Sequence, residues 1–284
     1  MVSLDAAGSD PIAEGRRNSD PLADAFAAVR ARLGLVALLL LLAGLAWWAT
    51  AGQMAGMDAG PGTDLGALGW FIGVWVLMMA AMMFPSVAPT VALYSRMTRR
   101  RSPIRPLLFT AAYLLVWSAV GLLSYGLFEL GRTWFGAQLS WDAGGRWAAA
   151  VVIAGAAVYE LTPLKNVCLA RCRSPLGFLL GDWREGSAGA VEMGSKHAAW
   201  CVGCCWALMA ALFALGVMSL VWMAVVAAVI TAEKTLPWRR TVLWTTTAAL
   251  LVLAVMVAAA PHAVPGLVVP GSAGSGASSM GMTP

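Results

Sequence analysis

Charged residues are scarce in this 284-residue chain. Only 12% of its residues are Asp, Glu, Lys or Arg, whereas 60% are hydrophobic and the mean hydropathy is +0.75. A soluble domain has about 25% charged residues, so these charges are too few to cover a water-soluble protein of this size. The composition therefore argues against the soluble enzyme classes and predicts a membrane protein.

Several catalytic signatures are also missing. The sequence has no phosphate-binding P-loop, no dinucleotide-binding glycine fingerprint and no His-Glu-x-x-His motif. The net charge of +5 is better explained by membrane topology than by nucleic-acid binding, so nucleic acid is not expected as a partner. Histidine and cysteine are few, at two and five residues, and their positions therefore carry more information than their number.

Long apolar runs divide the chain. They cover residues 33–49, 65–84, 107–130, 147–161, 197–232 and 241–260. The run 197–232 is too long for one helix across a hydrocarbon core of about 30 Å, so we expect two antiparallel helices joined by a turn near Gly216. The predicted fold class is all-α, a polytopic transmembrane bundle of about seven helices over residues 33–260. A polar cytoplasmic leader (residues 1–32) precedes it, and a flexible external tail (residues 261–284) follows.

Basic residues are distributed unequally between the two sides of this predicted bundle. Of the 19 Lys and Arg residues, 17 fall before the first helix or after the second, fourth and sixth helices. Only Arg132 and Arg146 fall in the opposite loops. Because cytoplasmic loops carry the excess of Lys and Arg, the N-terminus is expected in the cytoplasm and the C-terminus outside.

All five cysteines lie at the predicted cytoplasmic side, close to one of the two histidines. The group consists of Cys168, Cys172, His197, Cys201, Cys204 and Cys205. At about 100° per residue, the spacing His-x3-Cys-x2-Cys-Cys places four side chains in an arc of about 100° on one helix face. Single cysteines often serve only as small apolar residues, and a reducing cytoplasm disfavours disulfides. Four donors on one face instead favour a soft or borderline metal, Cu(I) first and Zn(II) second.

Methionines end the second predicted helix on the same side of the membrane. They are Met78, Met79, Met82 and Met83, and they precede a Phe-Pro pair. Methionine commonly fills gaps in helix bundles, but thioethers beside thiols favour Cu(I) over Zn(II). A weaker set could capture metal at the outer face: Met54, Met57, His262, Met280 and Met282.

Four ionisable residues lie at the level of the cysteines. They are Glu160, Lys165, Glu233 and Lys234. A charge within an apolar span is costly and marks a candidate functional site, so we expect these residues to support the metal site. Lys234 is equally consistent with an interfacial anchor of a helix end.

Several of these segments resemble a known bacterial family. They cover residues 78–85, 159–168, 172–175 and 197–209, the last with the signature Cys-x2-Cys-Cys-Trp. They are similar to a domain-of-unknown-function family whose members are described as predicted metal-binding integral membrane proteins. The resemblance extends over about residues 67–240. It implies a multi-pass metal-binding protein of the bacterial inner membrane and does not supply a reaction.

The favoured function is the handling of Cu(I) by binding, transfer or assembly of a copper enzyme. That enzyme or a metallochaperone is the expected partner, and the lipid bilayer is the expected surrounding. Two alternatives remain open. One is a membrane metallo- or thiol-oxidoreductase, since Cys201 and Cys204 have Cys-x-x-Cys spacing. The other is an accessory subunit of a membrane complex, in which cysteine and methionine only pack. No catalytic residue or organic cofactor is indicated, and a non-enzymatic role is favoured.

Overall fold

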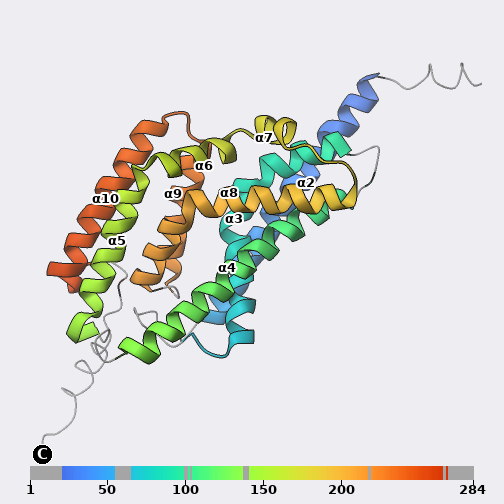
Figure 1. Ribbon diagram of the computed structural model, residues 1–284. Coiled ribbons are helices and arrows are strands. Elements are labelled where there is room, and N and C mark those ends of the chain that lie inside the picture. Colours follow the sequence, from blue (N-terminus) through green and yellow to red (C-terminus); the bar gives the residue numbers. More distant parts are fainter. Residues whose placement is uncertain are drawn as a thin grey trace, which may run out of the picture.

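Helices account for nearly all of the chain that the computed structural model describes, namely residues 21–54, 65–98, 102, 104–136, 141–216, 219–264 and 267. Within these ranges there are nine α-helices and no strand, which confirms the predicted all-α class. The helices are α2 (Pro21–Met54), α3 (Leu68–Thr98), α4 (Arg105–Phe135), α5 (Arg146–Glu160), α6 (Pro163–Arg173), α7 (Pro175–Gly181), α8 (Gly186–Leu215), α9 (Leu220–Thr235) and α10 (Arg239–Ala259) (Figure 1). A π-helical turn, Trp141–Gly145, precedes α5, and a 3-10 turn, Pro261–Ala263, follows α10.

Every predicted apolar run falls on a helix, although most helices are longer than the runs. The run 197–232 divides at Gly216, whose φ of +104° is unfavourable for residues with a side chain and ends α8. α8 begins at Gly186, eleven residues before His197. The short helices α6 and α7 have no counterpart among the runs: α6 is polar, and α7 has only seven residues.

The helix lengths are compatible with a membrane protein. Among the described residues, five helices are long and apolar enough to cross a membrane: α2, α3, α4, α8 and α10. α5 and α6 meet this requirement as a pair that is bent by 67°. α9 has 16 residues. At 1.5 Å per residue it is about 24 Å long, shorter than the usual hydrocarbon core. The count of seven spanning helices and the orientation of the termini therefore remain predictions.

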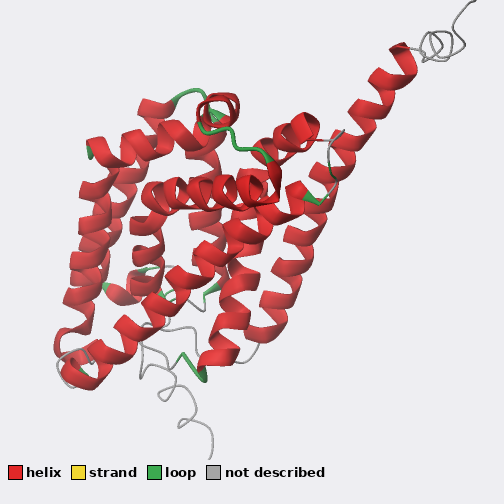
Figure 2. Ribbon diagram, turned by 45° about the vertical axis from the view of Figure 1, so that its right-hand side comes forward, coloured by secondary structure: helices red, strands yellow, loops and turns green. Residues whose placement is uncertain are grey.

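α8 connects two groups of helices. On one side α2 packs on α3, α3 on α4, and α4 along α8. On the other side α8 contacts α5 and α6, and α5 packs along α10. Figure 1 shows α5 and α10 side by side, with α2 and α3 at the opposite end of the molecule. Figure 2 shows that the described connections between helices are short. The outer surface carries many exposed leucines and valines, such as Leu41, Leu123 and Val255, as expected of a surface that faces lipid.

Thr162 and Pro163 explain the bend between α5 and α6. A proline disfavours helical backbone in the preceding residue, and Thr162 is extended, with φ −71° and ψ 149°. The Thr162 hydroxyl caps α6 by accepting a hydrogen bond from the Lys165 main-chain N–H at 3.3 Å. Pro163 occupies the first helical position, where no N–H is needed. This bend brings Lys165 close to Glu160, the last residue of α5.

Candidate metal centre

Three thiols of α8 form a compact group, which we call the thiol cluster: Cys201, Cys204 and Cys205. Their Sγ atoms all lie within 4.8 Å of one another, and all three residues are buried. The positions i, i+3 and i+4 share one helix face. No other group of three histidine, cysteine or carboxylate side chains in the described part of the chain is close enough to hold a metal ion.

Two thiols of the cluster are held by the preceding helical turn. The Cys204 and Cys205 thiols donate hydrogen bonds to the Cys201 main-chain carbonyl, at 3.1 Å and 2.9 Å. Bonds of this kind satisfy a polar side chain within its own helix. Metal ligation requires the thiolate, so loss of these protons frees both sulfurs to turn to an ion.

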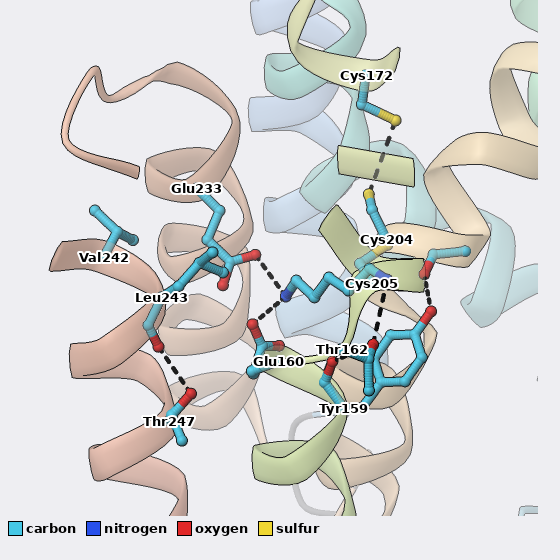
Figure 3. Close-up of polar contacts among 12 residues, drawn as sticks. Tyr159, Glu160, Thr162, Cys172, Cys204, Cys205, Glu233, Val242, Leu243 and Thr247 are labelled. Atoms are coloured by element: carbon cyan, nitrogen blue, oxygen red, sulfur yellow. Dashed lines mark hydrogen bonds and ion pairs between the residues drawn. The ribbon is translucent and has the colours of Figure 1, made fainter. Parts of the chain in front are cut away.

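Cys172 of α6 extends the cluster. Its Sγ lies 3.8 Å from the Cys204 Sγ, which joins the two cysteine groups of the sequence (Figure 3). Gly203 permits this approach of α6 to α8, since a Cβ there would lie 2.7 Å from the Cys168 Sγ. The Tyr159 hydroxyl donates to the Gly203 carbonyl at 2.6 Å and holds α5 against the same turn. The helices thus converge where α8 lacks a side chain.

Polar groups from two other helices converge on Cys201. The Lys234 Nζ of α9 lies 3.1 Å from the Cys201 Sγ, and the Tyr113 hydroxyl of α4 lies 3.0 Å from it. Lys234 also donates to the Ser86 hydroxyl of α3 at 3.2 Å. An ammonium group beside a sulfur stabilises the thiolate. The Lys234 ammonium therefore lies against the thiol cluster.

Three residues of this centre are not identified by the sequence pattern: Tyr113, Ser86 and Gly203. A hydroxyl within an apolar run needs a hydrogen-bond partner, and Tyr113 lies in the run 107–130. The need of this hydroxyl for a hydrogen-bond partner could have identified Tyr113 from the sequence. Ser86 and Gly203 carry no comparable signal, because small residues are common in packed membrane helices.

His197 lies one helical turn before Cys201 and is not part of the thiol cluster. Its ring is 4% exposed and packs on Phe178, with 4.9 Å between ring centroids. Phe109 and Tyr113 complete this aromatic surrounding. The His197 Nδ1 has no hydrogen-bond partner among the described residues. A buried polar atom without a partner is costly, so one ring nitrogen stays available near the cysteines.

The four methionines of α3 are fully buried: Met78, Met79, Met82 and Met83. They occupy the turns that precede Ser86, whose hydroxyl donates to the Met83 carbonyl at 2.9 Å. Ser86 also contacts Lys234, and Lys234 contacts Cys201. A chain of polar contacts therefore joins the methionine helix to the thiol cluster.

The predicted outer metal-capture residues are largely outside the described structure. Met57, Met280 and Met282 lie outside the described residues, and so does the side chain of Met54 at the end of α2. His262 is exposed in the turn Pro261–Ala263. Capture of metal by these residues remains a prediction.

Glu160, Lys165 and Glu233 form a second polar site, which we call the charge triad. The Lys165 Nζ donates to the Glu233 Oε2 at 2.8 Å and is ion-paired with Glu160 (Figure 3). All three side chains are buried, although Lys165 counts among the predicted cytoplasmic charges. The triad joins α5, α6 and α9. Consecutive residues of α9, Glu233 and Lys234, thus reach two different sites.

Comparison with known families agrees with a metal centre. Residues 72–257 match the PpoB2 family, which is described as copper chaperone. The chain therefore belongs to the PpoB2 copper chaperone family. Neither curated proteins nor solved structures include a significant match to this chain. The matched range contains the thiol cluster, the charge triad and the buried methionines, and its description agrees with the metal-binding function expected from the sequence.

Proposed function

We propose that this protein is a membrane-embedded chaperone that carries Cu(I) on the thiol cluster. The observation that carries this proposal is a set of three buried thiols within 4.8 Å of one another. Thiolates are soft ligands that suit Cu(I) and also Zn(II), and membership of a copper chaperone family favours copper between the two. The proposed location is the cytoplasmic side of the bacterial inner membrane.

The position of Lys234 fits a Cu(I)–thiolate complex. Cu(I) bound by two thiolates has a single negative charge, and a buried charge without compensation is costly. The ammonium at 3.1 Å from the Cys201 Sγ supplies one positive charge at that point. We infer that Cys201 and one neighbouring thiol are the principal ligands.

The remaining donors are suited to exchange of the ion. The third thiol of the cluster and Cys172, 3.8 Å from Cys204, offer alternative sulfurs to the same ion. A chaperone must bind its metal firmly and still release it, and ligand exchange between neighbouring sulfurs permits both. The receiving partner in this proposal is a copper enzyme or another metallochaperone. Cys168, His197 and the methionines Met78, Met79, Met82 and Met83 are proposed as additional donors.

A thiol oxidoreductase is the second candidate. The separation of 3.8 Å between the Cys172 and Cys204 sulfurs favours it, because a small movement would allow a disulfide. In that case two thiols should be lost on mild oxidation and regained on reduction during turnover. A protein that stays fully reduced while it transfers copper would contradict this function.

The test is copper retention by purified protein under reducing, oxygen-free conditions. Elemental analysis should find copper in the wild type, and a colorimetric Cu(I) chelator should remove it slowly. Replacing Cys201, Cys204 and Cys205 together with Ser should abolish retention. Cys168→Ser gives a graded comparison, since it removes a buried thiol outside the cluster that is proposed only as an additional donor, and it should therefore lose only a small part of the copper. Wild-type retention by the triple variant would refute the proposed site.

A further inference from the structure

The charge triad contains more negative than positive groups. Glu160 of α5 and Glu233 of α9 share one ammonium group, that of Lys165 on α6. The exposed fractions of these side chains are 0%, 2% and 0%, respectively. If both carboxyl groups were ionised, a single negative charge would remain in a fully buried position. Such a charge is strongly disfavoured in a low-dielectric surrounding.

Among the residues that the structure describes, no cation other than Lys165 forms an ion pair with either carboxyl group. Lys234 points to the thiol cluster. The Arg173 guanidinium of α6 donates to two main-chain carbonyls near the end of α9, those of Glu233 and Leu236. Arg240 of α10 makes no ion pair with either carboxylate among the residues that the structure describes. Toward α8, the Tyr159 hydroxyl of α5 donates to the Gly203 carbonyl.

Hydrogen bonding leads to the same conclusion. The Glu160 Oε1 and Glu233 Oε1 atoms are buried and have no hydrogen-bond partner within the described chain. Leaving a buried acceptor without a partner costs about 1–3 kcal/mol, and more for a charged group. A proton on one carboxyl group would cancel the excess charge and create a donor beside the second carboxylate. Two carboxyl groups that share a site commonly hold one proton between them.

We propose that Glu160 and Glu233 form a proton-binding site that holds one proton at neutral pH, with Lys165 as the shared counter-ion. A cavity of about 470 Å³ adjoins it; its lining is Glu160, Leu161, Asn166, Arg240, Leu243 and Trp244. The site does not depend on copper for its charge balance. It is nevertheless joined to the metal centre through α9, where Glu233 and Lys234 are adjacent.

Infrared spectroscopy of the metal-free full chain tests this proposal. A protonated carboxyl group has a carbonyl stretch that a carboxylate lacks, and the wild type at neutral pH should show it. Glu160→Gln and Glu233→Gln should each abolish the band, because the remaining carboxylate is then balanced by Lys165. Lys165→Met should increase the band about twofold, since both carboxyl groups then need a proton.

Glu129→Gln is the matched control for these variants. Glu129 is partly exposed and paired with Arg132 at 2.8 Å, so its replacement should leave the band unchanged. Circular dichroism and gel filtration in detergent identify any variant that fails to fold, and the wild-type spectrum alone keeps the proposal testable. Absence of the band in the wild type would overturn it. Retention of the band in either Gln variant would do so as well.

Discussion

The Nζ atom of Lys234 lies 3.1 Å from the Sγ atom of Cys201. The two residues are 33 positions apart, on α9 and α8. The same ammonium contacts Ser86, so it also fixes the end of the methionine-rich part of α3. In the proposed function, a positive charge at this point stabilises a thiolate before metal arrives and compensates the complex afterwards. Lys234 therefore links three helices around the proposed copper site.

Replacing Lys234 with Met should weaken Cu(I) binding. A hydrogen bond to a charged group contributes about 1.5–3 kcal/mol, so the affinity should fall about tenfold to a hundredfold. Competition with a Cu(I) chelator measures this change. Lys196→Met is the control, because the Lys196 side chain is exposed and paired with Glu192 and Asp182. Equal affinities of the two variants would exclude a role of Lys234 at the metal.

Replacing Gly203 with Ala should destabilise the protein. The added Cβ would meet the Cys168 Sγ at 2.7 Å and push α6 away from α8, at a cost of about 1–3 kcal/mol. Gly155→Ala on α5 is the matched control, since open space surrounds that position and alanine favours a helix by about 1 kcal/mol. Thermal unfolding in detergent should show a lower melting temperature for Gly203→Ala only. A higher melting temperature in both variants would show that α6 adjusts without strain.

Replacing Met82 and Met83 with Leu should separate copper from zinc. The swap nearly conserves volume and should cost less than about 1.5 kcal/mol of stability. Cu(I) retention should decrease, whereas Zn(II) retention should not change, because thioethers are soft ligands. Met223→Leu is the control for the loss of a buried methionine. Met223 lies near the start of α9, at the opposite end of that helix from Lys234. Identical chelator curves for wild type and double variant would remove these methionines from the site.

Reporter fusions should establish the membrane topology. The distribution of 17 of the 19 basic residues predicts cytoplasmic signals for fusions after Arg101 and after Arg240, and an external signal for a fusion at the C-terminal tail. An alkaline phosphatase and a fluorescent reporter at each position give opposite readouts and control each other. A cytoplasmic tail would mean that one of the seven predicted helices does not span; α5 with 15 residues and α9 with 16 residues are the shortest.

Hydropathy and helical periodicity account for most of the fold. An apolar run must close its own backbone hydrogen bonds in lipid, so the apolar runs became helices, with the run 197–232 divided into α8 and α9. Periodicity likewise placed Cys201, Cys204 and Cys205 on one face, because the repeat of a helix is fixed by its backbone. The bend of α5 and α6 follows from Pro163 locally, but its consequence, the approach of Lys165 to Glu160, does not.

Local sequence features are sufficient to predict the helical class, the shared face of the three thiols and a soft metal. These properties depend on local geometry and on the chemistry of single side chains. Only the tertiary structure decided that Lys234 reaches Cys201, that Cys172 reaches Cys204 and that two glutamates share Lys165. A hydropathy pattern shows how apolar each helix is. It does not show which polar side chains of different helices lie against each other, because that depends on how the helices pack.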